Sequence, residues 1–305
     1  MSHEKTLTFY LKSPLLERAQ KADVNVVNQI AAAVQSVGFR TEIRASTDAE
    51  YLGSATTDGY SMFHMEHPFH ERALTMRRSY FYPYWRIENT GQRWDWPVAK
   101  AVFDPSCADP VAAQVLTDKL RSRVFGDPSV PNTSGGYVYM PLQGRLLEHR
   151  SFQAMSPIDM IAETARRLPD HDIKLTLHPK ETYNDLEKQA LKDALTANPR
   201  LSLSKAGVLA LLQGCDLVVT QNSSIAIQGF LLHKPAVLFG EIDFHHIAGS
   251  VPNLGLDDAF VAATQADRLF DRYLYWFLET MSLNLARNDA QQQILQRLRQ
   301  HGWPV

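Results

Sequence analysis

The stretch Asp216–Gly240, DLVVTQNSSIAIQGFLLHKPAVLFG, decides the fold. It contains an apolar run at residues 217–220, a polar turn at 221–224, an apolar segment at 225–232 and a second apolar run at 236–239. Continuous apolar runs bounded by turn residues are typical of parallel strands that are covered on both faces. We therefore expect a strand, a turn, a helix and a second strand in this order, which is the rhythm of an α/β sheet.

The polar turn carries Asn222, Ser223 and Ser224 directly before the expected helix. The first N–H groups of a helix lack partners within the helix, and the dipole is positive at this end, so it attracts anions. The three side chains can cap the helix, hold a phosphate, or do both.

The same rhythm extends upstream through the second half of the chain. We expect strands at 137–142 and 173–177, a helix that begins at Ser156-Pro157, and further helices at 183–196 and 204–214. Ligands of open α/β sheets bind beyond the carboxyl ends of the strands. The residues in such positions are Gln143, Arg145, His178, Asn222, Ser223, Ser224 and Glu241.

The first half of the chain also alternates between strands and helices. We expect strands at 6–11, 39–44 and 58–65 and a helix whose apolar face includes Val27, Ile30 and Val34. Residues 66–96 are rich in His, Arg, Tyr and Trp and show little periodicity. This segment is either a long binding loop or an irregular packed surface. Residues 264–300 have a helical pattern that indicates core or interdomain packing.

A stretch rich in Gly, Pro, Ser and Asn at residues 126–136 has the composition of a linker. It predicts a first Rossmann-like domain at 1–130 and a second at 131–305, the latter including the C-terminal helices. A chain of 305 residues is long enough for two such domains.

Composition excludes several classes of function. The formal net charge of −2 gives no basic field for nucleic acid, and the two cysteines form no disulfide framework or metal motif. There is no P-loop and no G-x-G-x-x-G fingerprint, which disfavours kinases and dinucleotide enzymes. No apolar run reaches membrane-spanning length, and no leader-like segment is seen, so we expect a cytoplasmic protein that could attach to a complex at the inner membrane.

Two short motifs resemble a known family. His178-Pro179 followed by Ser223-Ser224 is similar to the HP and SS motifs of bacterial nucleotide-sugar transferases of the GT-B fold. The nearest are the sialyltransferases that use CMP-sialic acid and the capsule-synthesis Kdo transferases, and residues 220–240 resemble the capsule proteins especially. The resemblance covers residues 137–240 well and the first half poorly.

The resemblance implies two Rossmann-like parallel-sheet domains that face a cleft, with C-terminal helices crossing back to the first domain. It also implies that His178 contacts the donor phosphate and assists the leaving group, and that Ser223 and Ser224 hold the same phosphate. The chain departs from the family at the acidic element that supplies the base, where Thr57-Asp58-Gly59 is half a motif. Asp58 and Glu66 are the candidate bases.

We therefore expect a glycosyltransferase of bacterial surface or capsular polysaccharide synthesis that needs no metal and no cofactor. Its partners would be a nucleotide-sugar donor and a carbohydrate or glycolipid acceptor. The motifs resemble those of transferases whose donors carry one phosphate, which implies a CMP-linked sugar. The few cations near the strand ends, Arg145, Lys180 and Lys234, also suit one phosphate better than two. The alternatives are a nucleotide-sugar epimerase or hydrolase on the same fold, and a non-catalytic binding or scaffold protein of capsule assembly.

A metal-binding interpretation of residues 64–71 is disfavoured. His64, His67 and His70 are three residues apart, whereas helical zinc sites use a spacing of four, and Pro68 interrupts any helix. Substrate binding or packing explains these histidines and the neighbouring Glu66 and Glu71 better.

Overall fold

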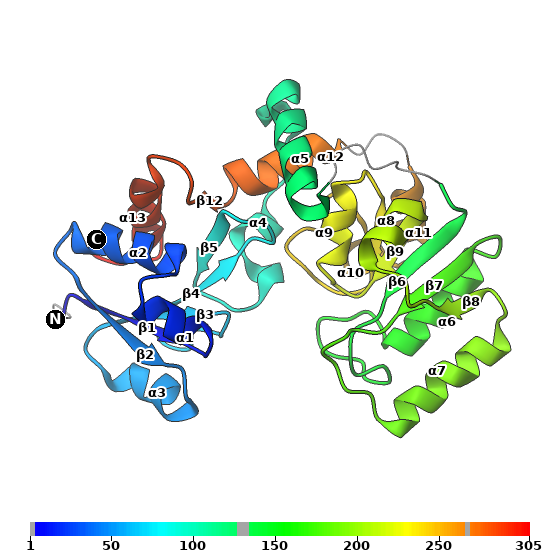
Figure 1. The fold of residues 1–305 in the computed structure, drawn as a ribbon, viewed down its shortest axis with the longest axis horizontal. Helices are drawn as coiled ribbons and strands as arrows, with labels where there is room; N and C mark the ends of the chain where they lie inside the picture. Colours follow the sequence, from blue (N-terminus) through cyan, green and yellow to red (C-terminus); the bar gives the residue numbers. More distant parts are fainter. Residues whose placement is uncertain (1–3, 127–133, 266–268) are drawn as a thin grey trace. The chain divides into compact units, whose positions relative to one another are not determined.

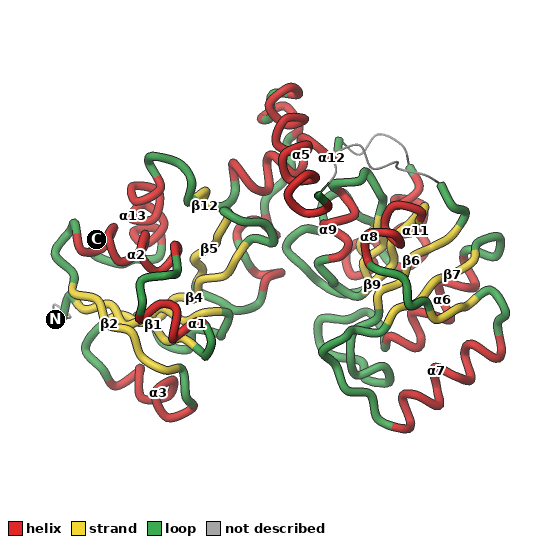
Figure 2. The backbone as a smooth tube through the Cα atoms, in the orientation of Figure 1, coloured by secondary structure: helices red, strands yellow, loops and turns green. Residues whose placement is uncertain are grey.

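The computed structural model describes residues 4–126, 134–265 and 269–305. Contacts divide the chain into two compact units: Met1–Trp96 together with Phe277–Val305 (unit 1), and Pro97–Trp276 (unit 2). In each unit the strands gather at the centre and helices lie around them (Figure 2). The predicted α/β class with two parallel-dominated sheets is confirmed.

Unit 1 is built on a six-stranded sheet in the order β12-β5-β4-β3-β1-β2. Strands β2, β1, β3 and β4 are parallel, whereas β5 and β12 are antiparallel to their neighbours. The elements are β1 (Thr6–Leu11), α1 (Leu15–Gln20), α2 (Asn25–Gln35), β2 (Arg40–Ala45), α3 (Asp48–Gly53), η1 (Ser54–Thr56), β3 (Tyr60–His64), β4 (Ala73–Arg78), β5 (Tyr84–Glu88), η2 (Arg93–Asp95), β12 (Leu283–Asn284) and α13 (Ala290–Gln300).

The C-terminal segment returns to unit 1, as predicted. Strand β12 pairs with β5, and α13 packs beside α2 on the same face of the sheet (Figure 1). Ile294 and Leu298 of α13 are fully buried in one core with Ile30 and Val34 of α2. This segment therefore completes the hydrophobic core of unit 1.

Two buried charged residues on β5 hold the returning segment. Arg86, 1% exposed, donates hydrogen bonds to the carbonyl oxygens of Met281 (2.7 Å) and Phe277 (3.3 Å). Glu88, with no exposed surface, lies 3.3 Å from Nη1 of Arg297 on α13. Residues two apart on a strand point to the same face, so both charges are directed at the C-terminal segment.

Unit 2 has a six-stranded, fully parallel sheet in the order β11-β10-β9-β6-β7-β8. This is the doubly wound order 3-2-1-4-5-6, in which the chain reverses direction between its first and fourth strands. The elements are α4 (Pro97–Lys100), η3 (Pro105–Cys107), α5 (Pro110–Phe125), β6 (Tyr137–Pro141), α6 (Pro157–Arg167), β7 (Asp172–Thr176), α7 (Asp185–Ala197), β8 (Leu201–Leu203), α8 (Val208–Gly214), β9 (Cys215–Thr220), α9 (Ile225–Phe230), β10 (Ala236–Leu238), β11 (Gly249–Ser250), α10 (Val251–Leu254), α11 (Leu256–Thr264), α12 (Phe270–Tyr275) and the π-helical turn η4 (Trp276–Thr280), which ends in unit 1.

Helices cover both faces of the unit 2 sheet. Met160 of α6 and Phe260 of α11 share a core with Val138 and Val219. On the other face Tyr137 donates to the carbonyl oxygen of Leu211 on α8 (2.9 Å). The strands β6, β9 and β10 are buried on both faces and read as mostly apolar runs, which is why the sequence predicted them.

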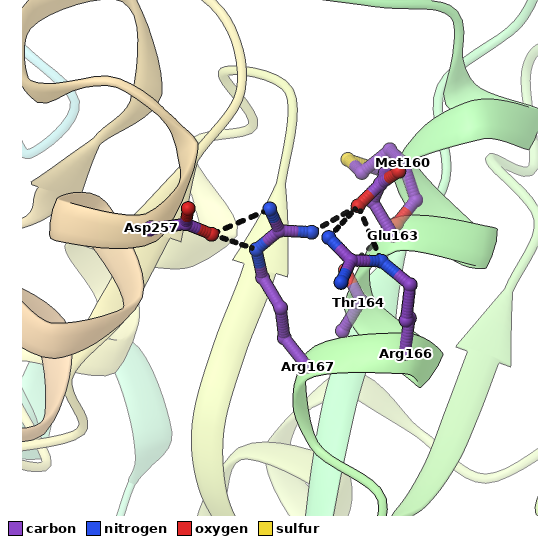
Figure 3. A network of polar contacts seen from close by, with 6 residues as sticks. All are labelled: Met160, Glu163, Thr164, Arg166, Arg167 and Asp257. Atoms are coloured by element: carbon purple, nitrogen blue, oxygen red, sulfur yellow. Dashed lines mark hydrogen bonds and ion pairs between the residues drawn. The ribbon is translucent and has the colours of Figure 1, made fainter.

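Ion pairs at the C-terminal end of α6 connect this helix to α11 (Figure 3). Arg167 donates through Nη2 and Nε to one oxygen of Asp257 (2.6 and 3.1 Å) and also pairs with Glu163. Arg166 pairs with the same Glu163 oxygen at 3.0 Å. Asp257 is 87% exposed, so solvent weakens this network, and we expect it to stabilise the fold little.

The predicted linker at 126–136 falls largely on residues 127–133, which lie outside the described residues. The contacts within the chain place the boundaries between the two units after Trp96 and after Trp276. Helix α5, which the sequence prediction included in the first domain, packs against α12 and belongs to unit 2. The first unit, predicted as 1–130, ends at Trp96 and resumes at Phe277.

Three predicted elements were wrong. Residues 66–96 are not a long loop, because they contain strands β4 and β5. The buried Arg86 and Glu88 break the apolar pattern that would have revealed β5. A helix does not begin at Ser204, since β8 ends at Leu203 and α8 begins at Val208, and residues 264–300 contain β12 between helical segments.

No helix in the described ranges is both long enough and apolar enough to cross a membrane.

We expect Glu88→Gln to destabilise the protein by about 3–5 kcal/mol, because it leaves the mostly buried Arg297 without its counter-charge. Glu163→Gln, which weakens the exposed network of Figure 3, is the matched control and should cost less than about 1 kcal/mol. Chemical denaturation of both variants measures the difference. Equal losses would show that the Glu88 pair does not secure the C-terminal segment.

Candidate functional site

The carboxyl ends of the unit 2 strands bring the predicted nucleotide-binding residues to one edge of the sheet. Gln143 follows β6, His178 follows β7, Asn222 follows β9 and Glu241 follows β10. The order of the sheet reverses between β6 and β9, and such a switch point is where open α/β sheets bind ligands.

Asn222 ties three of these loops together. Its backbone N–H donates to Oε1 of Gln143 (3.4 Å), and its Nδ2 donates to the carbonyl oxygen of Glu241 (3.3 Å). Beneath it, Thr220 donates to the carbonyl oxygen of Pro141 (3.0 Å). Asn222 is 7% exposed, so its side chain stabilises the carboxyl edge of the sheet and presents little surface to a ligand.

The two serines that follow do not form an ordinary helix cap. Ser224 is the N-cap residue of α9, but its side chain makes no capping hydrogen bond. Ser223 Oγ accepts from the N–H of Ile225 at 3.3 Å. Within the described part of the chain, the N–H groups of Ser223 and Ser224 have no protein acceptor. The turn therefore presents hydroxyls and two N–H donors, a combination that suits an oxyanion.

His178 is held in a defined orientation and protonation form. Its backbone N–H donates to the hydroxyl of Tyr183 (2.9 Å), and its ring Nδ1 accepts from the N–H of Lys180 (3.2 Å). An accepting Nδ1 carries no proton, so the neutral ring carries its proton on Nε2. His178 is thus prepared to donate a hydrogen bond through Nε2.

A pocket of about 410 Å³ lies beside these groups and includes both His178 and Ser223 in its lining. Tyr139 and Thr176 contribute from β6 and β7, with their hydroxyls 3.1 Å apart, and Lys205 contributes from the β8–α8 loop. Its volume falls within the range of about 300–1,000 Å³ that is common for small-molecule sites. The pocket can accept a small ligand with an anionic group near His178.

Sequence reasoning missed two cations of this edge. Lys205 was assigned to a helix, although Ser204, Ala206 and Gly207 around it are typical of a turn. Arg150 lies in the loop after β6, where its guanidinium is 4.8 Å from the ring of Phe152. Its Nε and Nη2 are buried and have no acceptor among the residues that the structure describes, and burial lowers the pKa of Arg150. No sequence pattern marked Arg150, because its position depends on long-range packing of the loop.

The cations counted from the sequence are mostly engaged elsewhere. Arg145 is exposed and pairs with Glu148 at 3.1 Å. Lys234 is 5% exposed and precedes β10, at the amino end of that strand. Lys180 and Lys205 are exposed cations that follow the carboxyl ends of β7 and β8.

In unit 1 the two candidate bases lie at opposite edges of the sheet. Asp58 precedes β3, at the amino ends of the parallel strands, whereas Glu66 follows β3 at their carboxyl ends. Glu66 lies 2.6 Å from Nζ of Lys12, which follows β1, and accepts from the hydroxyl of Ser46, which follows β2. Ligand sites of open sheets lie at the carboxyl ends, so the geometry favours Glu66 of the two.

The histidines near Glu66 have separate protein partners. His67 Nδ1 accepts from the N–H of Gly91 at 3.0 Å, and His70 Nε2 lies 3.2 Å from the hydroxyl of Ser54. In the ranges that the structure describes, no three His, Cys, Asp or Glu side chains are grouped in a way that could hold a metal ion.

No family model and no curated protein matches this chain. Among solved structures it is similar to KpsC of Thermosulfurimonas dismutans, a beta Kdo 2,7 transferase, with 12% identity and a TM-score of 0.52 over 97% of this chain and 99% of that one. The fold is GT-B-like.

Two further solved structures match less well. The beta Kdo 2,4 transferase of KpsC from the same organism has 10% identity and a TM-score of 0.45 over 89% of this chain and 90% of that one. A UDP-GlcNAc 2-epimerase from Neisseria meningitidis has 10% identity and a TM-score of 0.30 over 97% and 99%. The GT-B-like assignment rests on the first of the three, together with the two sheets.

Proposed function

We propose that this GT-B-like protein is a glycosyltransferase of bacterial surface or capsular polysaccharide synthesis that uses a CMP-linked sugar. The observation that carries the proposal is the joint presence of His178 and Ser223 in one pocket at the carboxyl ends of the unit 2 strands. The fold similarity to a beta Kdo 2,7 transferase supports it.

In the proposed reaction, the bond between the anomeric carbon of the donor and a phosphate oxygen breaks, and CMP leaves. An acceptor hydroxyl forms the new bond to the anomeric carbon and gives its proton to a base. The charge that develops on the phosphate is stabilised by Nε2–H of His178 and by the N–H and hydroxyl groups of Ser223 and Ser224. No metal ion is needed for this stabilisation.

The tautomer of His178, with its proton on Nε2, favours one of two possible roles, that of a hydrogen-bond donor over that of a general acid. A neutral ring with its proton on Nε2 is a good hydrogen-bond donor, and it would have to gain a second proton on Nδ1 before acting as a general acid. That second proton would face the N–H of Lys180, which donates to Nδ1 at 3.2 Å. We therefore assign His178 the part of holding the phosphate of the departing nucleotide.

We expect His178→Gln to retain more nucleotide affinity and turnover than His178→Ala, because the glutamine amide can place an N–H close to the position of Nε2. Loss of the donor in His178→Ala should weaken CMP binding by about 1.5–3 kcal/mol. Calorimetry and steady-state kinetics of both variants measure this. If the two variants are equally inactive while both still bind CMP, His178 transfers a proton and our assignment of its role fails.

The charges around the pocket support a nucleotide with one phosphate. Arg145 pairs with Glu148 and Lys234 lies at the amino end of β10, so Lys180 and Lys205 are the exposed lysines that follow strands at this edge. A diphosphate usually requires a second anion site, whereas one turn and few cations suit one phosphate.

We expect CMP to bind more tightly than CDP, UDP or GDP in direct competition. The change Ser223→Ala with Ser224→Ala should weaken CMP binding and lower the melting temperature only slightly, because Ser224 makes no capping bond and Ser223 accepts one long bond, 3.3 Å, from the N–H of Ile225. Fluorescence competition and a thermal scan measure both quantities. A tenfold preference for UDP, about 1.4 kcal/mol, would exclude the CMP assignment.

Glu66 is the candidate base for the acceptor hydroxyl. The ion pair with Lys12 and the bond from Ser46 hold the carboxylate of Glu66 in a fixed position at the carboxyl ends of the strands. The same partners also favour a second candidate function, a non-catalytic nucleotide-sugar-binding protein, since they occupy the carboxylate.

We expect Glu66→Gln to lower turnover by about 10²–10⁴-fold, the usual contribution of a general base. Asp58→Asn is the matched control and should leave turnover close to the unchanged protein, because Asp58 lies at the amino ends of the strands. A radiolabelled transfer assay compares the two. Transfer that survives in Glu66→Gln excludes Glu66 as the base, and CMP binding without any turnover in the unchanged protein would establish the non-catalytic function.

A further inference from the structure

The segment between β7 and α7, residues 177–184, engages three of the four polar groups of His178. The backbone N–H of His178 donates to the hydroxyl of Tyr183 (2.9 Å), and its carbonyl oxygen accepts from the N–H of Glu181 (3.2 Å). The ring Nδ1 accepts from the N–H of Lys180 (3.2 Å). Among the described residues, the remaining group, Nε2, has no protein partner. The segment therefore leaves one atom of His178 for a ligand.

Tyr183 joins this segment to the hydrophobic core of unit 2. Its side chain is 9% exposed and packs in the same core as Leu175 and Leu191. Close packing restricts a buried ring to one rotamer, so its hydroxyl stays in one place. The acceptor for the N–H of His178 is therefore fixed, and it determines the direction in which the chain leaves β7.

Glu187 connects a second loop to the start of α7. Its Oε2 accepts from the N–H of Asn184 (2.8 Å) in the capping box of the helix, and its Oε1 accepts from the N–H of Leu146 (2.6 Å) in the loop after β6. Hydrogen bonds to a carboxylate are stronger than those between neutral groups, and Glu187 is only 5% exposed. The carbonyl oxygen of Leu146 also accepts from the N–H of Ile158 on α6 (3.1 Å). The loop is thus held between two helix starts.

The loop that Glu187 holds reaches the serine turn. Gln143 lies three residues before Leu146, and its Oε1 accepts from the N–H of Asn222 (3.4 Å), which directly precedes Ser223. His178 and Ser223 line one pocket, although they follow different strands. Both are therefore connected through hydrogen bonds to the start of α7.

We propose that Tyr183 and Glu187 are positioning residues of the pocket that His178 and Ser223 line. Tyr183 orients Nε2 of His178, and Glu187 holds the loop that supports the serine turn through Gln143. Neither side chain has to touch the ligand. Donors that are already in place stabilise an anion better than mobile ones, because nothing has to reorganise when the charge arrives.

The inference rests on the proposed function where it concerns nucleotide binding, since it takes the phosphate of the nucleotide to lie at Nε2 of His178. The orientation of the ring and the position of the loop do not rest on it. Both can be measured on the full chain without a ligand.

Tyr183→Phe tests the first residue. It removes the acceptor of the His178 N–H and keeps the ring that packs in the core. We expect the segment to loosen, so that the N–H of Lys180 no longer holds Nδ1 free of a proton and the neutral ring populates both tautomers. Long-range ¹⁵N–¹H spectra of the histidine rings, assigned with His178→Gln and recorded above the pH at which the ring titrates, measure this. CMP binding should weaken about three- to tenfold.

Tyr137→Phe is the matched control. It removes another buried hydroxyl of unit 2, which donates to the carbonyl oxygen of Leu211 (2.9 Å), but Tyr137 is the first residue of β6 and lies at the amino edge of the sheet. We expect both Phe variants to lower the melting temperature to a similar extent. Tyr137→Phe should leave the tautomer of His178 and the affinity for CMP unchanged.

Glu187→Gln tests the second residue. A glutamine has one acceptor oxygen, so it can keep only one of the two N–H groups that Glu187 binds. We expect the N–H of Leu146 to exchange with deuterium at least tenfold faster and CMP binding to weaken about three- to tenfold. The tautomer of His178 should not change, because Tyr183 remains. Glu163→Gln, in the α6 network of Figure 3, is the control and should alter none of these quantities.

The two variants should each change their own readout, since Tyr183→Phe should leave the exchange of the Leu146 N–H close to that of the unchanged protein. A general loss of stability would instead change both readouts in both variants. The proposal fails if folded Tyr183→Phe keeps the single Nε2–H tautomer, or if folded Glu187→Gln leaves the Leu146 exchange unchanged. It also fails if Tyr137→Phe weakens CMP binding as much as Tyr183→Phe does, or if both positioning variants bind CMP as tightly as the unchanged protein.

Its failure differs from that of the proposed function. If the unchanged protein does not bind CMP, the proposed function fails, while the ring spectra and the exchange rates still decide whether Tyr183 and Glu187 position the two loops. If CMP binds and the ring and exchange readouts do not respond, only the inference is lost.

Discussion

A parallel sheet that is covered by helices on both faces leaves only its strand ends for chemistry, and the rest of this structure depends on that constraint. In unit 2, Val138 and Val219 are buried under α6 and α11, while Tyr137 is buried under α8. Polar backbone and side chains therefore collect where β6, β7, β9 and β10 end. Asn222 stabilises that edge by joining its neighbours, and it leaves Ser223 and His178 available for a ligand.

The sheet of unit 1 is subject to the same constraint, but one of its edges is built differently. Its sheet ends in two antiparallel strands, and the last of them comes from the C-terminal segment. The contact is secured by Arg86 and Glu88, which have almost no exposed surface. Burial of two charges is costly unless each is well matched, and here carbonyl oxygens and Arg297 provide the match.

Much of the fold could be predicted from the sequence, because strands such as β9 and β10 contain apolar runs and α6 begins with a Ser-Pro start signal. The α/β class followed from these patterns, whereas the GT-B-like arrangement and the return of the C-terminal segment followed from a resemblance in two motifs. Strand β5 could not be recognised, since the charges that hold it look like surface residues until the returning segment is known. For the site, local turn chemistry placed His178 and Ser223 at strand ends, whereas the position of Arg150 depends on contacts between residues far apart in the chain.

The discontinuity of unit 1 has a consequence for biosynthesis. Every residue of unit 2 has been translated once Trp276 is added, but unit 1 lacks β12 and α13 until Gln300 has been added. During that interval one edge of β5 has no neighbouring strand, Arg86 and Glu88 lack their partners in the C-terminal segment, and the apolar face of α2 is open. The segment made first is thus the one completed last, which reverses the order in which domains usually mature during synthesis.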